Sequence, residues 1–351
     1  MSAGEQSDLT TLADVAEAAG CSLAAASLAL RGKPGVSTAT RERVLEAART
    51  LGYNSRDGST RKRKKRMTVG LVIKAVHGDS PEANRFYAPV MAGIEQSCRR
   101  HRLNLLFATM PVDQHYHPIE VPRIVTDRSC DGLIVVGAHL SQPTADILRT
   151  VPATVLVDAY AEEHSVDSVV TDNILGARTA ISYLVACGHR EIAVLGTEPG
   201  AFPSILQRRR GYEQAIADAG LQPHYINTPY WAHEKAAIAG MEYLHAHPEV
   251  TAVFCANDLV AVSLLQNARQ AGISVPGRLS VIGFDDIDMA AFVSPPLTTM
   301  AVDKVGMGWV AVALLLHRIE RAEGSITQTR SRPQLVVRGS VGRPGERGRS
   351  G

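Results

Sequence analysis

Apolar residues recur at helical spacing through the first fifty positions, in three short stretches separated by glycine-containing turns. Thr11 with Asp14 forms a capping-box pattern at the start of the first stretch, and Gly20 follows its end. Ser22 and Ser37 precede the second and third stretches as N-cap residues. Two short helices joined by a tight turn and braced by a third are typical of a helix-turn-helix. A generic small helical bundle is the alternative.

After Val69 the pattern changes to apolar runs that alternate with amphipathic stretches. Because such runs are apolar at every position, they predict parallel strands covered on both faces by helices. The runs form two sets, which lie at residues 69–73, 103–108, 132–137 and 153–158, and then at 192–196, 252–256 and 279–284. The fold class predicted is therefore α/β, with an all-α helix-turn-helix head followed by a two-lobed, doubly wound parallel-sheet domain.

The domain boundaries follow from the same pattern. We predict a head at residues 9–55, a linker at 56–66, a two-lobed domain at 67–340 and a disordered tail at 341–351. The first lobe is expected to comprise about 67–168 and 301–325, and the second about 169–300 and 326–340. The linker segment NSRDGSTRKRKKR, residues 54–66, contains no apolar residue and ends in six consecutive basic side chains.

Charge is distributed unevenly along the chain. Residues 1–66 hold 12 basic and 7 acidic side chains, whereas residues 67–340 hold 22 basic and 27 acidic ones. A basic head and an acidic body suit a protein whose head meets phosphate groups. The five cysteines lie far apart, without a CxxC or Cys/His spacing, and no apolar run is long enough for a membrane span. The N-terminus lacks the pattern of a secretory signal, so we expect a cytoplasmic protein without membrane association.

The segment TLADVAEAAGCSLAAASLALRGKPGVSTATRERVLEAARTLGY, residues 11–53, resembles the head of the lactose/galactose-repressor family of bacterial transcription regulators. Residues 166–196, residues 254–287 and PPLTT at 295–299 resemble that family's effector-binding domain, in the same order. The resemblance implies a homodimeric repressor or activator whose affinity for a palindromic operator changes when a small metabolite binds between the lobes. We expect a repressor, with a sugar or nucleoside as its effector.

The resemblance also implies which residues contact DNA. The second helix would enter the major groove with Leu23, Ala24, Ser27 and Leu28. This set lacks Arg, Asn and Gln, so it favours contacts to thymine methyl groups over bidentate reading of guanine or adenine. Leu23 and Leu28 have packing inside the head as an equal alternative, and Ala26 and Leu30 are expected to pack there. The remaining candidates are Thr11, Ser22, Arg31, Lys33, Tyr53, Arg61, Lys62, Arg63 and Lys64.

The linker departs from the family's pattern. Family members usually follow the tyrosine with Pro-Asn and a short helix whose leucine enters the minor groove. Here Tyr53 is followed by Asn54 and Ser55, and no leucine occurs before Met67. The basic run is therefore expected either to neutralise phosphates or to act only as a solvated tether.

The effector site implied by the resemblance consists of polar and aromatic residues that follow predicted strands. They are Asn84, Phe86, Tyr87, Asp158, Asp172, Arg208, Asn257 and Asp285. Trp231 is added because an aromatic ring before the helix leading to Asn257 suits stacking on a sugar or base. Asp172 and Asn257 have helix capping as the alternative. For Asp285 the alternative is that it only caps or braces the second lobe. Asp285 and Arg208 are the leading candidates.

No catalytic motif appears in a suitable context, and the twelve histidines do not follow metal-ligand spacing. His115 and His117 lie in one loop without further ligands nearby in sequence. The sequence therefore predicts no enzyme activity, no cofactor and no metal site. The competing function is a solute-binding module of the same two-lobed type, which would carry an export signal in place of the helical head.

Overall fold

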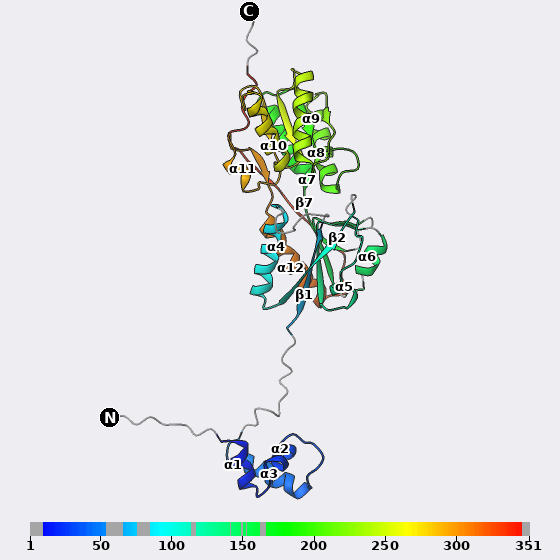
Figure 1. Cartoon of the computed structure of the whole chain (residues 1–351). Helices are drawn as coiled ribbons and strands as arrows, with labels where there is room; N and C mark the ends of the chain where they lie inside the picture. Colours follow the sequence, from blue (N-terminus) through cyan, green and yellow to red (C-terminus); the bar gives the residue numbers. More distant parts are fainter. Residues whose placement is uncertain are drawn as a thin grey trace, which may run out of the picture. The chain divides into compact units, whose positions relative to one another are not determined.

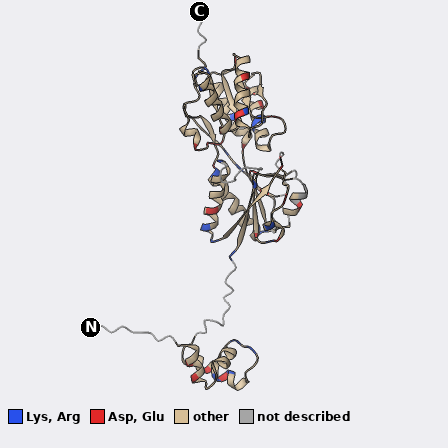
Figure 2. Ribbon diagram, in the orientation of Figure 1, with Lys and Arg blue, Asp and Glu red and all other residues tan. Residues whose placement is uncertain are grey.

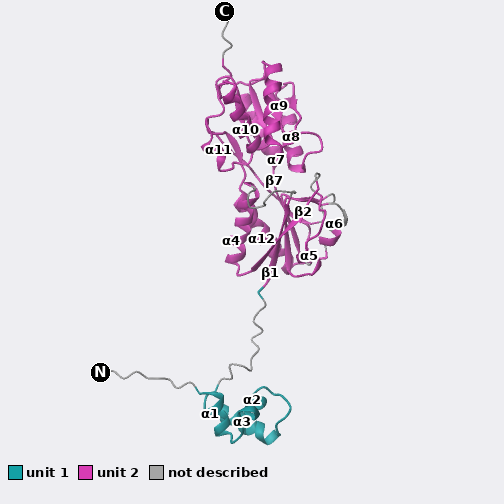
Figure 3. Ribbon diagram, in the orientation of Figure 1, with its two compact units in different colours: residues 1–66 teal, residues 67–351 magenta. Residues whose placement is uncertain are grey.

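The computed structural model describes residues 10–53, 66–75, 85–113, 117–140, 142–148, 150–151, 153–161 and 166–345. These residues form two compact units, residues 1–66 and residues 67–351, as Figure 3 shows by colour. Each unit has its own hydrophobic core, as expected for a chain of this length. The N-terminal unit is called the head below, and the larger unit is called the effector domain.

The head consists of α1 (Leu12–Ala18), α2 (Leu23–Leu30) and α3 (Thr38–Thr50). Each helix begins at its predicted N-cap residue, because the hydroxyl oxygens of Thr11, Ser22 and Ser37 accept hydrogen bonds from backbone N–H groups three residues later. Thr11 also completes the capping box with Asp14. The helices enclose a small core of buried side chains, which comprises Val15, Ala16, Ala19, Ala26, Ala29, Val44 and Ala48.

The first lobe is built around a six-stranded parallel sheet with the strand order β13-β7-β5-β3-β1-β2. Helices α4 and α12 pack together on one face, and α5 and α6 lie on the other (Figure 1). The strands are β1 (Thr68–Ala75), β2 (Asn104–Pro111), β3 (Gly132–Val136), β5 (Thr154–Val157), β7 (Asp167–Thr171) and β13 (Gln328–Ser331). The helices are α4 (Tyr87–Arg100), α5 (Arg123–Thr126), α6 (Gln142–Leu148) and α12 (Lys304–Glu320). A two-stranded pair joins β4 (His139–Leu140) to β6 (Tyr160–Ala161).

The second lobe has a four-stranded parallel sheet with the order β11-β10-β8-β9. Helices α7 and α8 pack as one pair and α9 and α10 as another (Figure 1). The strands are β8 (Ile192–Leu195), β9 (His224–Ile226), β10 (Ala252–Cys255) and β11 (Ser280–Ile282). The helices are α7 (Asn173–Ala186), α8 (Pro203–Asp218), α9 (His233–Ala246), α10 (Asp258–Gln270) and α11 (Met289–Phe292). Antiparallel β12 (Thr299–Ala301) and β14 (Gln334–Val336) complete this lobe. Both sheets confirm the predicted α/β class.

The chain passes between the lobes three times, after β7, after β12 and after β13. The expected lobe boundaries need correction at two of these passes. β7 continues to Thr171 in the first sheet, beyond the predicted limit at 168. β13 pairs with β7, so residues 328–331 belong to the first lobe and not to the second. β13 is a polar edge strand whose side chains are exposed or half-buried, so its composition carries no signal of a strand.

The predicted disordered tail also begins too early. Val341 packs against the domain core, and the Gly342 backbone N–H donates to the Ser280 hydroxyl while its carbonyl accepts from the same hydroxyl or from the His189 ring. Residues 341–345 are therefore part of the second lobe, because Gly342 and Gly345 lie beside the segment from Pro276 to Ser280 that leads into β11. The rest of the predicted tail lies outside the described residues. No single described helix is long and apolar enough to cross a membrane; only α1 and α2 taken together, bent by 101°, meet that test.

Candidate functional site

The exposed surface of α2 contains the residues that the sequence placed on DNA. Leu23 is 54% exposed and Ala24 is exposed, whereas Ser27 and Leu28 are half-buried. Ala26 is fully buried and Leu30 packs against the head core, as predicted. The start of α2 therefore offers a small apolar surface with little charge of its own.

The other predicted DNA contacts of the head lie around this surface. Arg31 and Lys33 are exposed just after α2, and the Lys33 carbonyl accepts a hydrogen bond from the Arg41 guanidinium, 2.6 Å away. Basic and acidic positions are interspersed on the head (Figure 2). Thr11 and Ser22 are the N-cap residues of α1 and α2, so both lie at helix N-termini. Tyr53 is half-buried and packs against the core of the head. The linker candidates Arg61, Lys62, Arg63 and Lys64 lie outside the described residues.

In the first lobe, a buried carboxylate lies at the carboxyl end of an inner strand of the sheet. Asp158 comes directly after β5 with a left-handed φ of 42°, and its Oδ2 accepts a hydrogen bond of 2.9 Å from the Tyr87 hydroxyl. The Tyr87 ring fits closely over Gly137, where an added Cβ would come within 2.7 Å of the ring. Lys74, near the end of β1, is the cation whose charge acts most strongly on Asp158, ahead of Arg208 in the second lobe. Lys74 and Asp158 come from β1 and from the end of β5, which both pair with β3, and Tyr87 begins α4.

In the second lobe, Arg208 on α8 is held at three points. Its guanidinium donates to Asp285 Oδ1 at 2.9 Å, to Asn173 Oδ1 at 3.0 Å and to the Ala256 carbonyl at 2.6 Å. It also lies over the Phe284 ring, 3.8 Å from the ring centre. Arg208 and Asp285 are both buried. The two leading candidates from the sequence therefore form one ion pair.

Side chains of the two lobes meet beside these charged groups. The Lys74 ammonium lies 4.3 Å from the centre of the Phe202 ring, and the Tyr160 and Phe202 rings contact edge to face at 5.5 Å. Val112 of the first lobe belongs to the same apolar cluster as Phe202 and Ala256 of the second. We call this region the interlobe site. It lies at the carboxyl ends of the strands of both sheets, where ligands of doubly wound folds bind.

Burial changes the titration of the charged groups at the interlobe site. Burial raises the pKa of Asp158 to about 6, although Lys74 and the Tyr87 hydrogen bond oppose that rise. Burial likewise lowers the pKa of Lys74 to about 8, against the stabilising charge of Asp158. The pKa of Asp285 is also raised by burial, with Arg208 as the main opposing charge. A site of this kind presents fixed charges in a region of low dielectric constant.

Three buried hydroxyl groups have no hydrogen-bond partner within the described part of the chain. They belong to Tyr160, Thr197 and Thr228. Thr197 and Thr228 each follow the carboxyl end of a second-lobe strand, and Tyr160 begins β6 in the first lobe. Because buried polar groups are nearly always paired in proteins, unpaired hydroxyls at a sheet edge indicate a place for a polar ligand or for water.

The remaining predicted effector residues have varied surroundings. Asp172 caps α7 by accepting from Leu175, and Asn257 caps α10 by accepting from Val260. Both capping alternatives are therefore realised. Phe86 is half-buried with its ring edge to face against Tyr87 at 5.1 Å, and Trp231 is 61% exposed after β9. Asn84 lies outside the described residues.

Sequence reasoning missed several residues that contact this cluster. Lys74 ends a run of apolar residues, VGLVI, and that interruption of a buried strand is the one signal that pointed to it. Asn173 directly follows Asp172, but its side chain meets Arg208 only through the packing of α7 on α8. Nothing in the sequence around Phe202 or Tyr160 indicates a site residue, because each ring joins the site through its contact with the other lobe.

Comparison with known proteins gives two family matches. Residues 11–55 match the lacI family of bacterial regulatory proteins, and residues 181–341 match a periplasmic binding protein-like domain. The chain is 31% identical over 345 residues to the HTH-type transcriptional repressor CytR of Escherichia coli, which covers 97% of this chain and 99% of that protein. It is 30% identical over 338 residues to the ribose operon repressor of Haemophilus influenzae, with 95% and 99% covered.

Solved structures agree with these matches. A complex of the transcriptional regulator CelR with cellobiose has a TM-score of 0.67 and 28% identity, and the alignment covers 94% of this chain and 99% of that one. The chain therefore belongs to the lacI family of bacterial regulatory proteins. It is a DNA-binding transcription regulator with a helix-turn-helix head and a periplasmic binding protein-like effector domain, and not an enzyme.

Proposed function

We propose that this regulator is a repressor that binds a palindromic operator as a homodimer and binds a sugar or nucleoside at the interlobe site. The pairing of Arg208 with Asp285 beside contacts between the lobes is the observation that carries the proposal. A ligand that contacts both lobes favours one arrangement of them over another, and it shifts the equilibrium by its difference in affinity for the two. The protein acts where its operator lies, inside the cell.

The chemistry of the interlobe site favours a ligand with several hydroxyl groups. Asp158 and Asp285 supply carboxylate acceptors, Arg208 supplies donors, and the three unpaired hydroxyls add groups that both donate and accept. The rings of Phe202 and Tyr160 offer an apolar face for a sugar or base ring. A relative is named for the ribose operon, and another was solved with cellobiose, which is the same class of ligand.

All predicted effector residues remain candidate ligand contacts in the proposal, but they differ in how directly they would contact the ligand. Asp285, Arg208, Asp158 and Tyr87 belong to the buried cluster itself. Asp172 and Asn257 cap helices that begin at the sheet edge, so a ligand contact there would use the remaining carboxylate or amide atoms. Trp231, Phe86 and Asn84 would act at the margin. Trp231 is exposed, as expected of a ring that stacks on a ligand only after it binds.

On the DNA side, we propose that Leu23 and Ala24 contact base edges, with Ser27 and Leu28 beside them. Arg31 and Lys33 are exposed and would contact phosphates. Arg61, Lys62, Arg63 and Lys64 would add sequence-independent affinity. Neutralising these linker residues together is expected to reduce the dependence of log affinity on log salt by up to about 0.9 per lost phosphate contact. An unchanged salt slope would show that the linker is only a tether.

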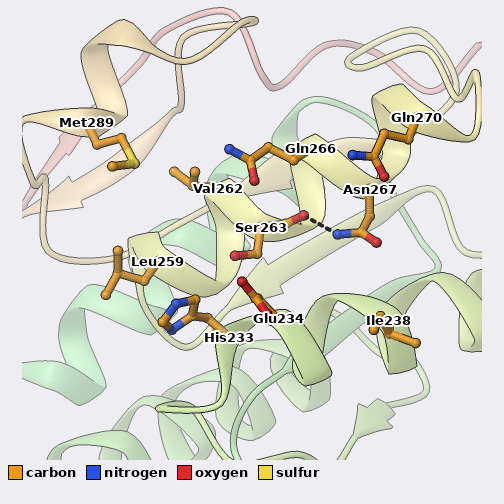
Figure 4. A pocket seen from close by; sticks show the side chains of 10 residues that line it. All are labelled: His233, Glu234, Ile238, Leu259, Val262, Ser263, Gln266, Asn267, Gln270 and Met289. Carbon is orange, nitrogen blue, oxygen red and sulfur yellow. Dashed lines mark hydrogen bonds between the residues drawn. The ribbon is translucent and has the colours of Figure 1, made fainter. Parts of the chain in front are cut away.

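A surface on the second lobe is suited to a second copy of the chain. A depression of about 420 Å³ lies between α9 and α10 and is lined by Ile238, Leu259, Val262 and Met289 with polar side chains around them (Figure 4). Phe292, on the neighbouring α11, is 87% exposed, and Ile238 is 52% exposed. Exposed large apolar side chains are typical of interfaces between subunits. A two-fold dimer would also place two heads on the two halves of a palindrome.

The competing function is solute binding without regulation of DNA. The head argues against it, because its exposed α2 surface and three capped helices form a complete helix-turn-helix. A solute-binding protein has no use for such a unit.

The experiment that tests the ligand class is a thermal-shift screen of the full-length protein against pentoses, hexoses, disaccharides, nucleosides and nucleobases. A ligand that binds only the folded state raises the melting temperature of the effector domain. We expect a sugar or nucleoside to do so, and its effect to be lost in Asp285→Asn. A shift with nucleobases alone, or a shift that Asp285→Asn leaves intact, would contradict the proposed ligand or its site.

A further inference from the structure

A cluster of metal-ligating side chains lies in the second lobe, away from the interlobe site. His224, His247 and Glu249 each offer one ligand atom, and these atoms all lie within 4.8 Å of one another. His224 begins β9, His247 follows the end of α9, and Glu249 lies in the loop before β10. Sequence spacing gave no sign of this group, because the fold brings His224 to the other two.

The two imidazoles are already oriented by neighbouring groups. His224 Nε2 lies 2.8 Å from Glu191 Oε2, and its Nδ1 lies 3.0 Å from the Tyr243 hydroxyl. His247 Nδ1 lies 3.0 Å from Glu249 Oε1, and its ring stacks on Tyr243 with centres 4.1 Å apart. Metal-ligating histidines are commonly held by a carboxylate on one ring nitrogen, as Glu191 holds His224, and Glu249 Oε1 lies near enough to His247 Nδ1 for both atoms to contact one ion.

We propose that His224, His247 and Glu249 bind one divalent transition-metal ion of the zinc class, with Glu191 as a fourth ligand or as the carboxylate that orients His224. Two imidazoles with one or two carboxylates suit zinc, nickel, cobalt and copper ions. Calcium and magnesium ions are disfavoured, because they prefer all-oxygen ligands. The side chains of all four residues are partly accessible, so an ion reaches them without opening of the lobe.

The position of the cluster indicates what the ion would do. Glu191 and His224 stand at the amino ends of β8 and β9, whereas the interlobe site lies at the carboxyl ends of the strands. β9 is a three-residue edge strand that pairs only with β8 among the described strands. An ion bound here would tie the end of α9 to this edge strand. It would therefore stabilise the second lobe without contacting the effector.

The alternative is that the two His–Glu pairs are ordinary polar contacts of a partly exposed surface. Such pairs are common and contribute little to stability. The two accounts differ in one respect: only a metal site binds an ion with a stoichiometry of one per chain and loses that ion when a single ligand is removed.

The test uses full-length protein freed of metal with a chelator and titrated with Zn²⁺, with heat of binding as the readout. Co²⁺ serves as a spectroscopic probe, because its absorption reports tetrahedral coordination by nitrogen and oxygen. The variants are His224→Gln, His247→Gln and Glu249→Gln. His245→Gln is the matched control, because His245 is exposed in the last turn of α9, two residues before His247, and is not in the cluster.

We expect wild type and His245→Gln to bind one Zn²⁺ per chain, and each ligand variant to bind it about tenfold more weakly or worse. At a zinc concentration just above the wild-type dissociation constant, zinc should raise the melting temperature of wild type and His245→Gln and leave that of His247→Gln nearly unchanged. Circular dichroism of the metal-free variants checks that they are folded. Absence of saturable binding by wild type overturns the proposal, and so does binding of equal strength by His245→Gln and all three ligand variants.

Discussion

Each lobe places one buried aspartate at the interlobe site, and the two aspartates are stabilised differently. Asp285 in the second lobe pairs directly with Arg208, which makes two further hydrogen bonds. Asp158 in the first lobe accepts a hydrogen bond from the neutral Tyr87 hydroxyl, and Lys74 acts on it through its charge. Burial raises the pKa of Asp158 to about 6 because these two partners offset it only in part, and burial lowers that of Lys74 to about 8.

The difference suggests a division of labour between the lobes. Burial also raises the pKa of Asp285, but Arg208 opposes that rise and a guanidinium remains charged at all relevant pH values, so the second lobe presents a fixed positive charge. The first lobe presents groups that titrate near neutral pH, in a setting where protonation and ligand binding influence each other. The predictions below test whether the Arg208–Asp285 pair is a fixed charged anchor and whether the Asp158–Lys74 pair responds to pH.

The largest effect is expected from Arg208→Met. Removing one partner of a buried ion pair leaves Asp285 uncompensated, which typically costs about 3 to 5 kcal/mol of the free energy of unfolding. Denaturant unfolding measures this loss. Arg210→Met is the control, because Arg210 is an exposed arginine of the same helix. Equal stability of the two variants would show that the pair does not anchor the second lobe.

The next effect concerns pH. The pKa of Asp158 is raised by burial, so between about pH 4 and pH 6 the folded state holds a proton that the unfolded state has released. Stability from this group is therefore full below pH 4 and is lost as the pH rises through about 6. The loss amounts to up to about 3 kcal/mol. Asp158→Asn should remove this slope from the unfolding free energy measured against pH. If the unfolding free energy of Asp158→Asn depends on pH as that of wild type does, the raised pKa of Asp158 is not the cause of the slope.

Lys74→Met should give a smaller effect with a distinct signature. The variant loses a cation over the Phe202 ring, a contact worth about 2 kcal/mol when desolvated. It also removes the charge that holds the pKa of Asp158 down, so the pH at which stability is lost should move above 6. Comparison with Lys74→Met/Asp158→Asn isolates this coupling, because the shift must vanish in the double variant. A shift that survives there would assign it to another group.

The smallest effect is expected at Trp231. Because this side chain is mostly exposed, Trp231→Ala should change the free energy of unfolding by no more than about 0.5 kcal/mol. Its indole should nevertheless report effector binding by a change in fluorescence, which a Trp309→Phe background would isolate. A fluorescence response of the wild-type protein that persists unchanged in Trp231→Ala, which keeps Trp309, would exclude Trp231 from the site.

Local features of the fold could be predicted from the sequence, and long-range pairings could not. The head helices begin where predicted because Thr11, Ser22 and Ser37 act on N–H groups three residues away. The apolar strands were found because burial on both faces makes them apolar at every position. β13 was missed because a short polar edge strand has no such pattern.

The same distinction applies to the site. Arg208 and Asp285 were named separately, but 77 positions separate them, and only the fold of the second lobe brings α8 to the segment that follows β11. Lys74 and Phe202 were missed because their contact joins different lobes. Asp172 and Asn257 were identified with both of their possible roles, since capping is local and a ligand contact is not.

The central claim is that a ligand held by Asp285 and Arg208 controls operator binding. The direct measurement is the operator affinity of wild type and Asp285→Asn, with and without the sugar or nucleoside that raises the melting temperature. Asparagine keeps an oxygen for Arg208 and removes the charge. We predict that affinity without effector stays near wild type, while the effector's influence falls about tenfold, since a lost charged hydrogen bond costs about 1.5 kcal/mol or more. Loss of operator binding and effector response together, or an undiminished response, would contradict the claim.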